Sequence, residues 1–332
     1  MRVLIVLPGA LGDVLRALPL LGRLRRAHPD AILGWLVEPL SAPLLESHPW
    51  LDRLHRFERT GGARAFLAVA REARAAGYDV ALDLGRGLKS ATLAVLSGAP
   101  RRIGFARADA REASWLAATE RIPAQGTARS KLEQFLAFGE LLGASAGPIE
   151  FGLVPAPAAV ARVDALLAGA AGPLAAACVG SSCPSRRWWP APTAAVLDRL
   201  HDRFGTTGVV LGAGADVGFA RAVAAQARSP VVDLAGRTSL AELVAVLVRA
   251  RVAFGPDSGA LHLAAALGVP VVSLWGATSA ARSAPYGSER WVVEGTSPCR
   301  PCFLTRCPIG RVCMSAIDAE TVCATAVEAL AA

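Results

Sequence analysis

Short apolar runs alternate with stretches of helical periodicity along the first half of the chain. Residues 2–7 are mostly apolar and precede a glycine-containing loop, which predicts a buried strand followed by a helix from Asp13. Leucines recur on or near one face of that helix, and Pro19 is expected to kink it or to open its first turns. Strands are also predicted at residues 31–37 and 78–84, a turn and short strand at 44–57, and helices at 64–76 and 129–142.

A segment rich in Pro, Ala and Gly, residues 147–173, interrupts this alternation and contains one predicted helix, at 160–167. The pattern then restarts with a strand at 174–179, a loop at 180–189 and a helix from Thr193. Strands that alternate with helices are typical of parallel sheets. The length of 332 residues and the hydrophobic fraction of 53% suit two cores. We therefore expect an α/β protein with two domains, residues 1–155 and residues 156–332.

Residues 252–278 carry the strongest functional pattern. An apolar run ends at Pro256, Asp257 or Ser258 is placed to cap the next helix, and a second apolar run follows Gly268. This order predicts a strand, loop, helix and strand. In open parallel sheets, ligands bind beyond the carboxyl ends of the strands, where helix N-termini present unpaired backbone N–H groups that favour phosphate.

Two further residues of this unit fit such a ligand. Gly259 allows a ligand to approach the backbone closely, and His262 lies one helical turn after Ser258, where it is able to donate to a diphosphate. Taken singly, these residues also fit plain structural roles, as helix caps and a core histidine. Taken together, they predict a phosphate or nucleotide site.

Two motifs resemble a known family. The pattern D-S-G-x-x-H-L-A-A-A-x-x-x-P that starts at Asp257, with G-x-T after it, resembles the donor-binding motif of the ADP-heptose:lipopolysaccharide heptosyltransferases, glycosyltransferase family 9. The sequence G-D-V-L-x-x-L-P-x-L around Asp13 is similar to the family's N-terminus. The resemblance covers nearly the whole chain. It implies a GT-B fold, with two Rossmann-like parallel-sheet domains facing each other across a cleft, the first binding the acceptor and the second the nucleotide-sugar donor.

The resemblance also implies an activity, the inverting transfer of a heptose from ADP-heptose to a lipopolysaccharide inner-core acceptor, with no cofactor required for the chemistry. The loop at 180–189 is similar to the family's phosphate loop, with Arg187 where Lys is usual; a guanidinium retains the charge and grips a diphosphate bidentately. Asp216 occupies the family's Glu position near the donor ribose. The implied donor-binding residues are Ser182, Arg187, Asp216, Asp257, Ser258, Gly259 and His262.

Asp13 is the predicted general base. Inverting transfer requires the acceptor hydroxyl to lose its proton as it attacks from the face opposite the departing diphosphate. Asp13 follows a strand and a glycine loop, at the carboxyl edge of the first predicted sheet. In isolation, an acid at this position would also suit a helix N-terminus, where it interacts with the helix dipole.

The net charge of +8 favours anionic partners, and an anionic lipopolysaccharide core fits it. The chain has no zinc-finger spacing, aromatic-studded basic strand or arginine-rich tail, so we expect no nucleic-acid partner. No apolar run reaches the ~20 residues of a membrane span, and the N-terminal apolar run is too short for a signal peptide. We expect a cytoplasmic protein with peripheral contact to the inner membrane surface.

Two other functions fit parts of the sequence. Gly212, Gly214 and Gly218 follow a strand, and Asp233 ends the next one, which imitates a dinucleotide-binding fingerprint and suggests an NAD-dependent oxidoreductase. The spacing is one residue too long for that fingerprint, and the unit does not open a domain. A catalytically inactive nucleotide-sugar-binding protein on the same fold is the second alternative.

Four cysteines are clustered with the spacing C-x2-C-x4-C-x5-C, and three others lie apart. Clustered thiols in a cytoplasmic chain more often bind metal than form disulfides, and tetrahedral zinc is the usual occupant. The spacing matches no standard zinc ribbon or ferredoxin motif. Structural zinc, reversible disulfides and free thiols therefore stay open for Cys299, Cys302, Cys307 and Cys313.

Overall fold

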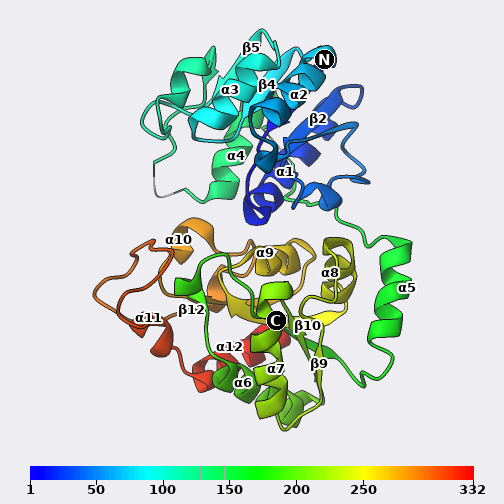
Figure 1. Ribbon diagram of the computed structural model, residues 1–332, viewed down its shortest axis with the longest axis vertical. Helices are drawn as coiled ribbons and strands as arrows, with labels where there is room; N and C mark the ends of the chain where they lie inside the picture. The colour runs from blue at the N-terminus through cyan, green and yellow to red at the C-terminus, as the bar shows by residue number, and fades with distance from the viewer. Residues whose placement is uncertain (127–128, 146) are drawn as a thin grey trace. The chain divides into compact units, whose positions relative to one another are not determined.

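The computed structural model describes residues 1–126, 129–145 and 147–332 and divides the chain into two compact units, Met1–Leu153 and Val154–Ala332 (Figure 1). The division falls in the segment rich in Pro, Ala and Gly, close to the boundary predicted after residue 155. Within the described residues, each unit contains one parallel sheet of six strands. The predicted class, α/β with two parallel-sheet domains, is confirmed.

The sheet of the first unit has the strand order β3-β2-β1-β4-β5-β6. Its central strand β1 (Arg2–Val6) pairs with β2 and β4, and Leu4 and Val6 share one buried cluster with helices α2 and α3. Helices α1 and α4 pack against each other. The elements of this unit are β1 (Arg2–Val6), α1 (Leu11–Ala27), β2 (Ile32–Val37), η1 (Ala42–Leu44), β3 (Arg53–Arg56), η2 (Arg59–Gly61), α2 (Gly62–Ala75), β4 (Val80–Asp83), α3 (Leu88–Leu96), β5 (Arg101–Gly104), η3 (Ser114–Ala117), β6 (Glu120–Arg121) and α4 (Lys131–Glu140).

Helix α1 differs from its prediction at its start and at Pro19. It begins at Leu11, before Asp13, and continues without interruption through Pro19, so its first turns do not open. The leucines predicted to share a face, Leu15, Leu18, Leu21 and Leu24, are all buried. Burial of this apolar face stabilises the helix, and tertiary packing of this kind commonly outweighs one missing backbone hydrogen bond.

The sheet of the second unit has the strand order β12-β11-β10-β7-β8-β9. Helices α6, α7 and α12 contribute to one buried cluster with residues of β7, β8, β10 and β11. The elements of this unit are α5 (Pro157–Leu166), β7 (Leu174–Cys178), η4 (Pro184–Arg186), α6 (Pro190–Phe204), β8 (Thr207–Leu211), η5 (Gly214–Asp216), α7 (Val217–Gln226), β9 (Val231–Asp233), α8 (Leu240–Leu247), β10 (Ala250–Pro256), α9 (Gly259–Ala266), β11 (Val271–Trp275), α10 (Ala280–Ser283), η6 (Glu289–Trp291), β12 (Val292–Glu294), α11 (Val312–Ser315) and α12 (Ala319–Ala331).

Strands β7 and β10 approach each other closely at their carboxyl ends. Gly255 in β10 has a φ of +149°, and a Cβ atom there would lie 2.1 Å from the carbonyl oxygen of Cys178 at the end of β7. Only glycine fits this position without moving a backbone. The close approach brings the chain after β10 beside the loop after β7. In the part of the chain that the structure describes, no helix has the length and apolar character that crossing a bilayer requires.

Candidate active site

The predicted donor-binding residues follow adjacent strands of the second sheet. Strands β11, β10, β7 and β8 are neighbours and run parallel, so their carboxyl ends lie at one edge. Asp257 follows β10, the loop at 180–189 follows β7, and Asp216 follows β8. This edge is where ligands bind in open parallel sheets.

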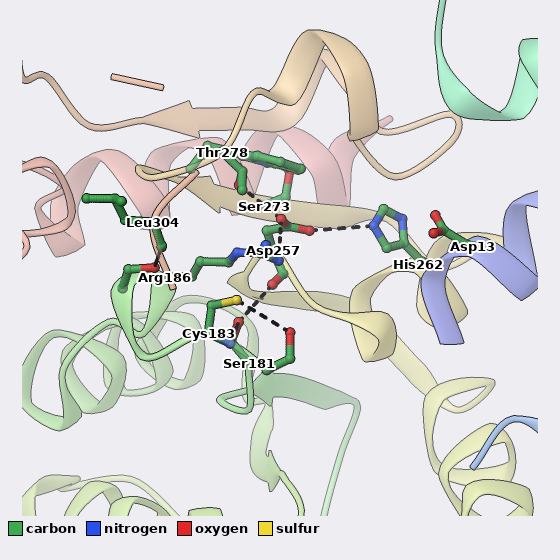
Figure 2. Close-up of polar contacts among 12 residues, drawn as sticks. Asp13, Ser181, Cys183, Arg186, Asp257, His262, Ser273, Thr278 and Leu304 are labelled. Atoms are coloured by element: carbon green, nitrogen blue, oxygen red, sulfur yellow. Dashed lines mark hydrogen bonds and ion pairs between the residues drawn. The ribbon is translucent and has the colours of Figure 1, made fainter. Parts of the chain in front are cut away.

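Asp257 is the centre of the network at this edge (Figure 2). Its Oδ2 accepts a hydrogen bond from the Thr278 hydroxyl at 2.9 Å and lies 3.0 Å from Nη1 of Arg186. Its Oδ1 lies 3.7 Å from Nε2 of His262. The backbone carbonyl of Asp257 accepts from the Ser181 hydroxyl at 3.2 Å. Loops after three strands therefore converge on one carboxylate.

The pKa of Asp257 is lowered, although the residue is buried. Burial alone would raise the pKa, and it is the largest single influence on this group. The hydrogen bond from His262, the charge of Arg186 and the hydrogen bond from Thr278 oppose it and outweigh it. Asp257 is thus held as an anion that fixes the orientation of the Arg186 guanidinium.

The capping prediction for helix α9 is wrong in one respect. The helix begins after Ser258 as its N-cap residue, but no side chain of the cap accepts a hydrogen bond from the first turn. Asp257 is instead engaged by the residues of the neighbouring loops. Gly259 is the first helical residue, and His262 is buried one turn later. The strand, loop, helix and strand order predicted for this stretch is confirmed.

Arg187 and Asp216 form a second pair at the same edge. Nη2 of Arg187 lies 2.8 Å from Oδ1 of Asp216, whose side chain is only 5% exposed. The carboxylate lies directly over Gly180 and Gly212, because a Cβ atom at either position would come within 2.7 Å of Asp216. The glycines at the ends of β7 and β8 therefore make room for this acid.

Several buried polar atoms at this edge have no hydrogen-bond partner among the described residues. They are Nε of Arg186, Nε of Arg187, the Ser258 hydroxyl and Oδ1 of Asp216, whose contact with Arg187 is an ion pair. Buried donors of this kind are costly unless a ligand or water satisfies them. Two guanidinium N–H groups and a hydroxyl are suited to the oxygens of a diphosphate. Ser182 differs from these groups, since its side chain is exposed and lies 3.8 Å from the Cys183 sulfur.

In the glycine loop that suggests an oxidoreductase, a side chain of this protein already binds a backbone N–H group. The Ala213 N–H, which lies between Gly212 and Gly214, donates to Oδ2 of Asp216 at 2.9 Å. In a dinucleotide-binding loop such N–H groups face the pyrophosphate. Here the Asp216 carboxylate takes this donor, which disfavours a pyrophosphate at that position.

Asp13 lies in the first unit, in the first turn of α1. Its Oδ1 accepts from Nη1 of Arg16 at 2.9 Å and from Nζ of Lys131 at 2.8 Å. Asp13 therefore stands at the carboxyl edge of the first sheet, as predicted, beside two cations that were not predicted as its partners.

The segment that carries the clustered cysteines, residues 299–313, is hydrogen-bonded to the loop at 180–189. The Ser185 hydroxyl donates to the Leu304 carbonyl at 2.5 Å, and Nη1 of Arg311 donates to the Arg187 carbonyl at 2.8 Å. The segment thus fixes the backbone on which Arg187 is carried. This contact connects the cysteine-rich region to the predicted donor-binding residues.

The structure does not confirm structural zinc at the four clustered thiols, for which the sequence leaves zinc, disulfides and free thiols open. Burial raises the pKa of Cys313, and the charges of Cys299, Cys302 and Cys307 raise it further. Among the residues that the structure describes, however, no three Cys, His, Asp or Glu side chains form a group suited to a metal ion. All seven cysteines are free thiols in this structure.

Three residues at these two edges have no role assigned from the sequence: Arg186, Thr278, which the sequence shows only as the end of a motif, and Lys131. The doublet Arg186-Arg187 in front of two tryptophans was a usable signal, since paired arginines beside a glycine loop suit a diphosphate. Nothing local points to Lys131, which reaches Asp13 from 118 positions away.

Comparisons with known proteins agree on one family. The model of glycosyltransferase family 9 (heptosyltransferase) matches residues 66–312. Lipopolysaccharide heptosyltransferase 1 of Pseudomonas aeruginosa is 28% identical over 325 residues, which cover 92% of this chain and 87% of that protein. A family 9 glycosyltransferase structure from Veillonella parvula has a TM-score of 0.86 and 21% identity, covering 99% of this chain and 97% of the other.

A second solved structure, E. coli heptosyltransferase WaaC with ADP-2-deoxy-2-fluoro heptose, has a TM-score of 0.76 and 23% identity, covering 99% of both chains. The family match spans most of the chain, and the structural likeness extends over both parallel-sheet units. The predicted GT-B fold and the predicted enzyme class are confirmed. This chain belongs to glycosyltransferase family 9 and is a glycosyltransferase with two Rossmann-like domains.

Proposed function

We propose that this enzyme transfers a heptose from ADP-heptose to a sugar hydroxyl of the lipopolysaccharide core, with inversion at the anomeric carbon. The observation that carries the proposal is the network of Asp257, Arg186, Arg187 and Asp216 at the carboxyl edge of the second sheet. The names of the relatives support the substrate class, since several are lipopolysaccharide heptosyltransferases.

The donor is bound by the second unit in this proposal. Arg186 and Arg187 each hold one acidic partner through a terminal nitrogen and have a buried Nε–H without a partner among the described residues. Their Nε–H groups donate to the diphosphate oxygens, and the two positive charges stabilise the negative charge that develops as ADP leaves. Ser182, Ser258, Gly259 and the start of α9 contact the same diphosphate.

Asp216 and His262 complete the donor site as we propose it. Asp216 orients Arg187 and accepts from a ribose hydroxyl, which is a further contact a buried carboxylate is able to make. His262 lies on the first turn of α9 and donates toward the phosphates while it supports Asp257. The solved WaaC relatives contain ADP or an ADP-heptose analogue, which is in keeping with this donor. The arginines supply the positive charge at the leaving group, so the proposed chemistry requires no cofactor.

The acceptor is activated by the first unit. Asp13 accepts the proton of the acceptor hydroxyl as its oxygen attacks the anomeric carbon, and the bond to the ADP oxygen breaks on the opposite side. Arg16 and Lys131 keep Asp13 ionised and ready for the proton. The domain roles predicted from the sequence, acceptor in residues 1–155 and donor in residues 156–332, are retained.

We also propose a peripheral contact with the anionic inner membrane, from its cytoplasmic side. On the first unit, Leu116 is 66% exposed beside Trp115, and the Arg107 and Arg121 guanidinium groups lie 5.0 and 5.4 Å from the Trp115 ring. An exposed aliphatic side chain, an aromatic ring and two arginines suit a negatively charged lipid surface. Sedimentation with phosphatidylglycerol vesicles should be weaker for Leu116→Ser than for the wild type, and equal sedimentation would contradict this surface.

The test of the function is a transfer assay with ADP-heptose and a lipopolysaccharide acceptor that lacks heptose, in which mass spectrometry detects the heptosylated product. Parallel calorimetric titrations with ADP, UDP and NAD should show preference for ADP. Preference for NAD would support the oxidoreductase alternative. ADP binding without any transfer would support an inactive nucleotide-sugar-binding protein.

A further inference from the structure

Two cations from different helices bind the same oxygen of Asp13. Arg16, one turn further along α1, places Nη1 2.9 Å from Oδ1, and Lys131 at the start of α4 places Nζ 2.8 Å from it. The side chains are partly shielded, with 29% exposure for Asp13, 27% for Lys131 and 11% for Arg16. Partial shielding makes these pairs stronger than the average surface ion pair.

The start of α4 is fixed at the position from which Lys131 reaches Asp13. Ser130 and Glu133 form a capping box, in which Glu133 accepts from the Ser130 N–H at 2.8 Å and the Ser130 hydroxyl accepts from the Glu133 N–H at 3.3 Å. Helix α4 packs against α1, which carries Asp13. Lys131 is the first residue of α4, so the capping box fixes the backbone from which its side chain extends to Asp13.

A general base has two requirements that these cations meet. Its carboxylate must be ionised when the acceptor hydroxyl arrives, and one of its oxygens must point along the path of the proton. Cations on one oxygen favour the ionised form and limit rotation of the carboxylate. We propose that Lys131 is a positioning residue for Asp13 in the transfer reaction, with Arg16 as the second cation; this inference rests on the proposed function.

The packing of the two helices separates this role of Lys131 from a purely structural one. A structural clamp between α1 and α4 would require only that the two helices stay together, and their packing against each other already supports that. A role in orienting the base predicts instead that kcat depends on the charge at position 131.

The chain offers a matched control because Lys89 is its only other lysine. Lys89 also belongs to the first unit and lies in the first turn of helix α3. Its Nζ lies 3.6 Å from Oε1 of Glu38. Lys131→Met should lower kcat roughly 10- to 100-fold, the range for a misplaced catalytic group, with the donor KM unchanged. Lys131→Arg should recover most of the rate, and Lys89→Met should behave like the wild type.

A measurement that does not depend on transfer examines the pair directly. Reductive methylation followed by peptide mapping gives the reactivity of each lysine, and Asp13→Asn should raise the reactivity of Lys131 but not that of Lys89. If Lys131→Met keeps the wild-type kcat, or if Lys131→Arg is as slow as Lys131→Met, the inference fails while the proposed function stands. If the wild type transfers no heptose although Asp13→Asn still raises the Lys131 reactivity, the proposed function fails and takes the positioning role with it.

Discussion

Arg187 and Asp216 form an ion pair, with Nη2 of Arg187 2.8 Å from Oδ1 of Asp216. They belong to the loops that follow two neighbouring strands of the second sheet, β7 and β8. Sequence resemblance gives them separate tasks, the first at the diphosphate and the second near the ribose. Their pairing means that neither acts alone. Asp216 orients the guanidinium, and the loop that carries Arg187 is held by Arg311 through a hydrogen bond to its carbonyl.

Arg187→Ala should raise the donor KM and lower kcat, because the guanidinium binds the diphosphate and steadies its charge as it leaves. Arg187→Lys should recover most of the loss, since Lys is usual at this position in the family. Arg311→Ala provides the comparison: it loosens the loop without removing the guanidinium, so its effect should fall mainly on KM. An Arg187→Ala enzyme with wild-type kinetics would show that this loop does not bind phosphate.

Asp257→Ala and His262→Ala should each weaken ADP binding. Asp257 fixes Arg186, and His262 is the proposed phosphate donor; the loss of one charge-assisted hydrogen bond costs ~1.5–3 kcal/mol. Calorimetric titration with ADP measures the difference. Asp257→Asn is the matched variant, because it keeps the acceptor for Thr278 but loses the charge that orients Arg186. ADP affinity equal to the wild type in both alanine variants would assign purely structural roles to these residues.

Asp83, buried at the end of β4, predicts a pH-dependent stability. Burial raises its pKa to about 7, although hydrogen bonds from Ser90 and from the Gly85 N–H oppose the rise. Since this pKa is raised in the folded state, the stability that the protonated carboxyl contributes is complete below about pH 4 and is lost as the pH rises through about 7.

Asp83→Asn should therefore raise the Tm at pH 8 and change it little at pH 4, because the amide imitates the protonated acid and still accepts from Gly85. Thermal unfolding of both proteins across this pH range measures the effect. Asp79→Asn is a suitable control, since Asp79 precedes the same strand. A Tm difference that does not change with pH would mean that Asp83 is ionised throughout.

The cysteine segment, residues 299–313, is expected to act on the donor site only through its structure. Metal analysis of protein purified without chelator, together with a thiol count under denaturing conditions, separates zinc, disulfides and free thiols. Cys302→Ser should leave transfer intact if folding is intact. Loss of transfer in a folded Cys302→Ser protein would contradict a purely structural role.

Sequence patterns predicted much of this molecule because its strands are strongly apolar and its helices are bounded by clear residues. The strand, loop, helix and strand after Val252 and the leucine face of α1 are examples. The sequence does not predict strand β6, since a segment of two residues has too little periodicity to detect.

The sequence indicates which polar residues gather at the carboxyl edge of the second sheet, but not how they pair. A side-chain cap for α9 was a reasonable expectation from Asp257 and Ser258 alone. The expectation was wrong because Arg186 and Thr278, which are distant in sequence, bind the Asp257 carboxylate in the folded chain. In the same way, no local pattern connects Lys131 with Asp13. Long-range pairing of charged groups depends on how strands are ordered and helices packed, and spacing along the chain does not encode it directly.

Asp13→Asn tests the proposed chemistry most directly. The amide keeps the size of the side chain and its place in the first turn of α1, and its oxygen still accepts from Arg16 and Lys131. It cannot take up the proton of the acceptor hydroxyl. Loss of a general base lowers kcat by roughly 10²-fold or more, and the expected enzyme binds ADP normally, because the donor-binding residues belong to the second unit.

A variant of Arg16 distinguishes the effect of losing the Asp13 base from the effect of losing one of its cationic partners. Arg16→Met removes a partner of Asp13 but leaves the carboxylate, so its kcat should lie between those of the wild type and Asp13→Asn. Steady-state rates at saturating ADP-heptose and acceptor, with calorimetry for ADP, decide the order. If Asp13→Asn transfers heptose at nearly the wild-type rate, another group accepts the proton. The cations at Asp13 would then serve acceptor binding, since two positive charges beside one neutral amide still attract an anionic sugar.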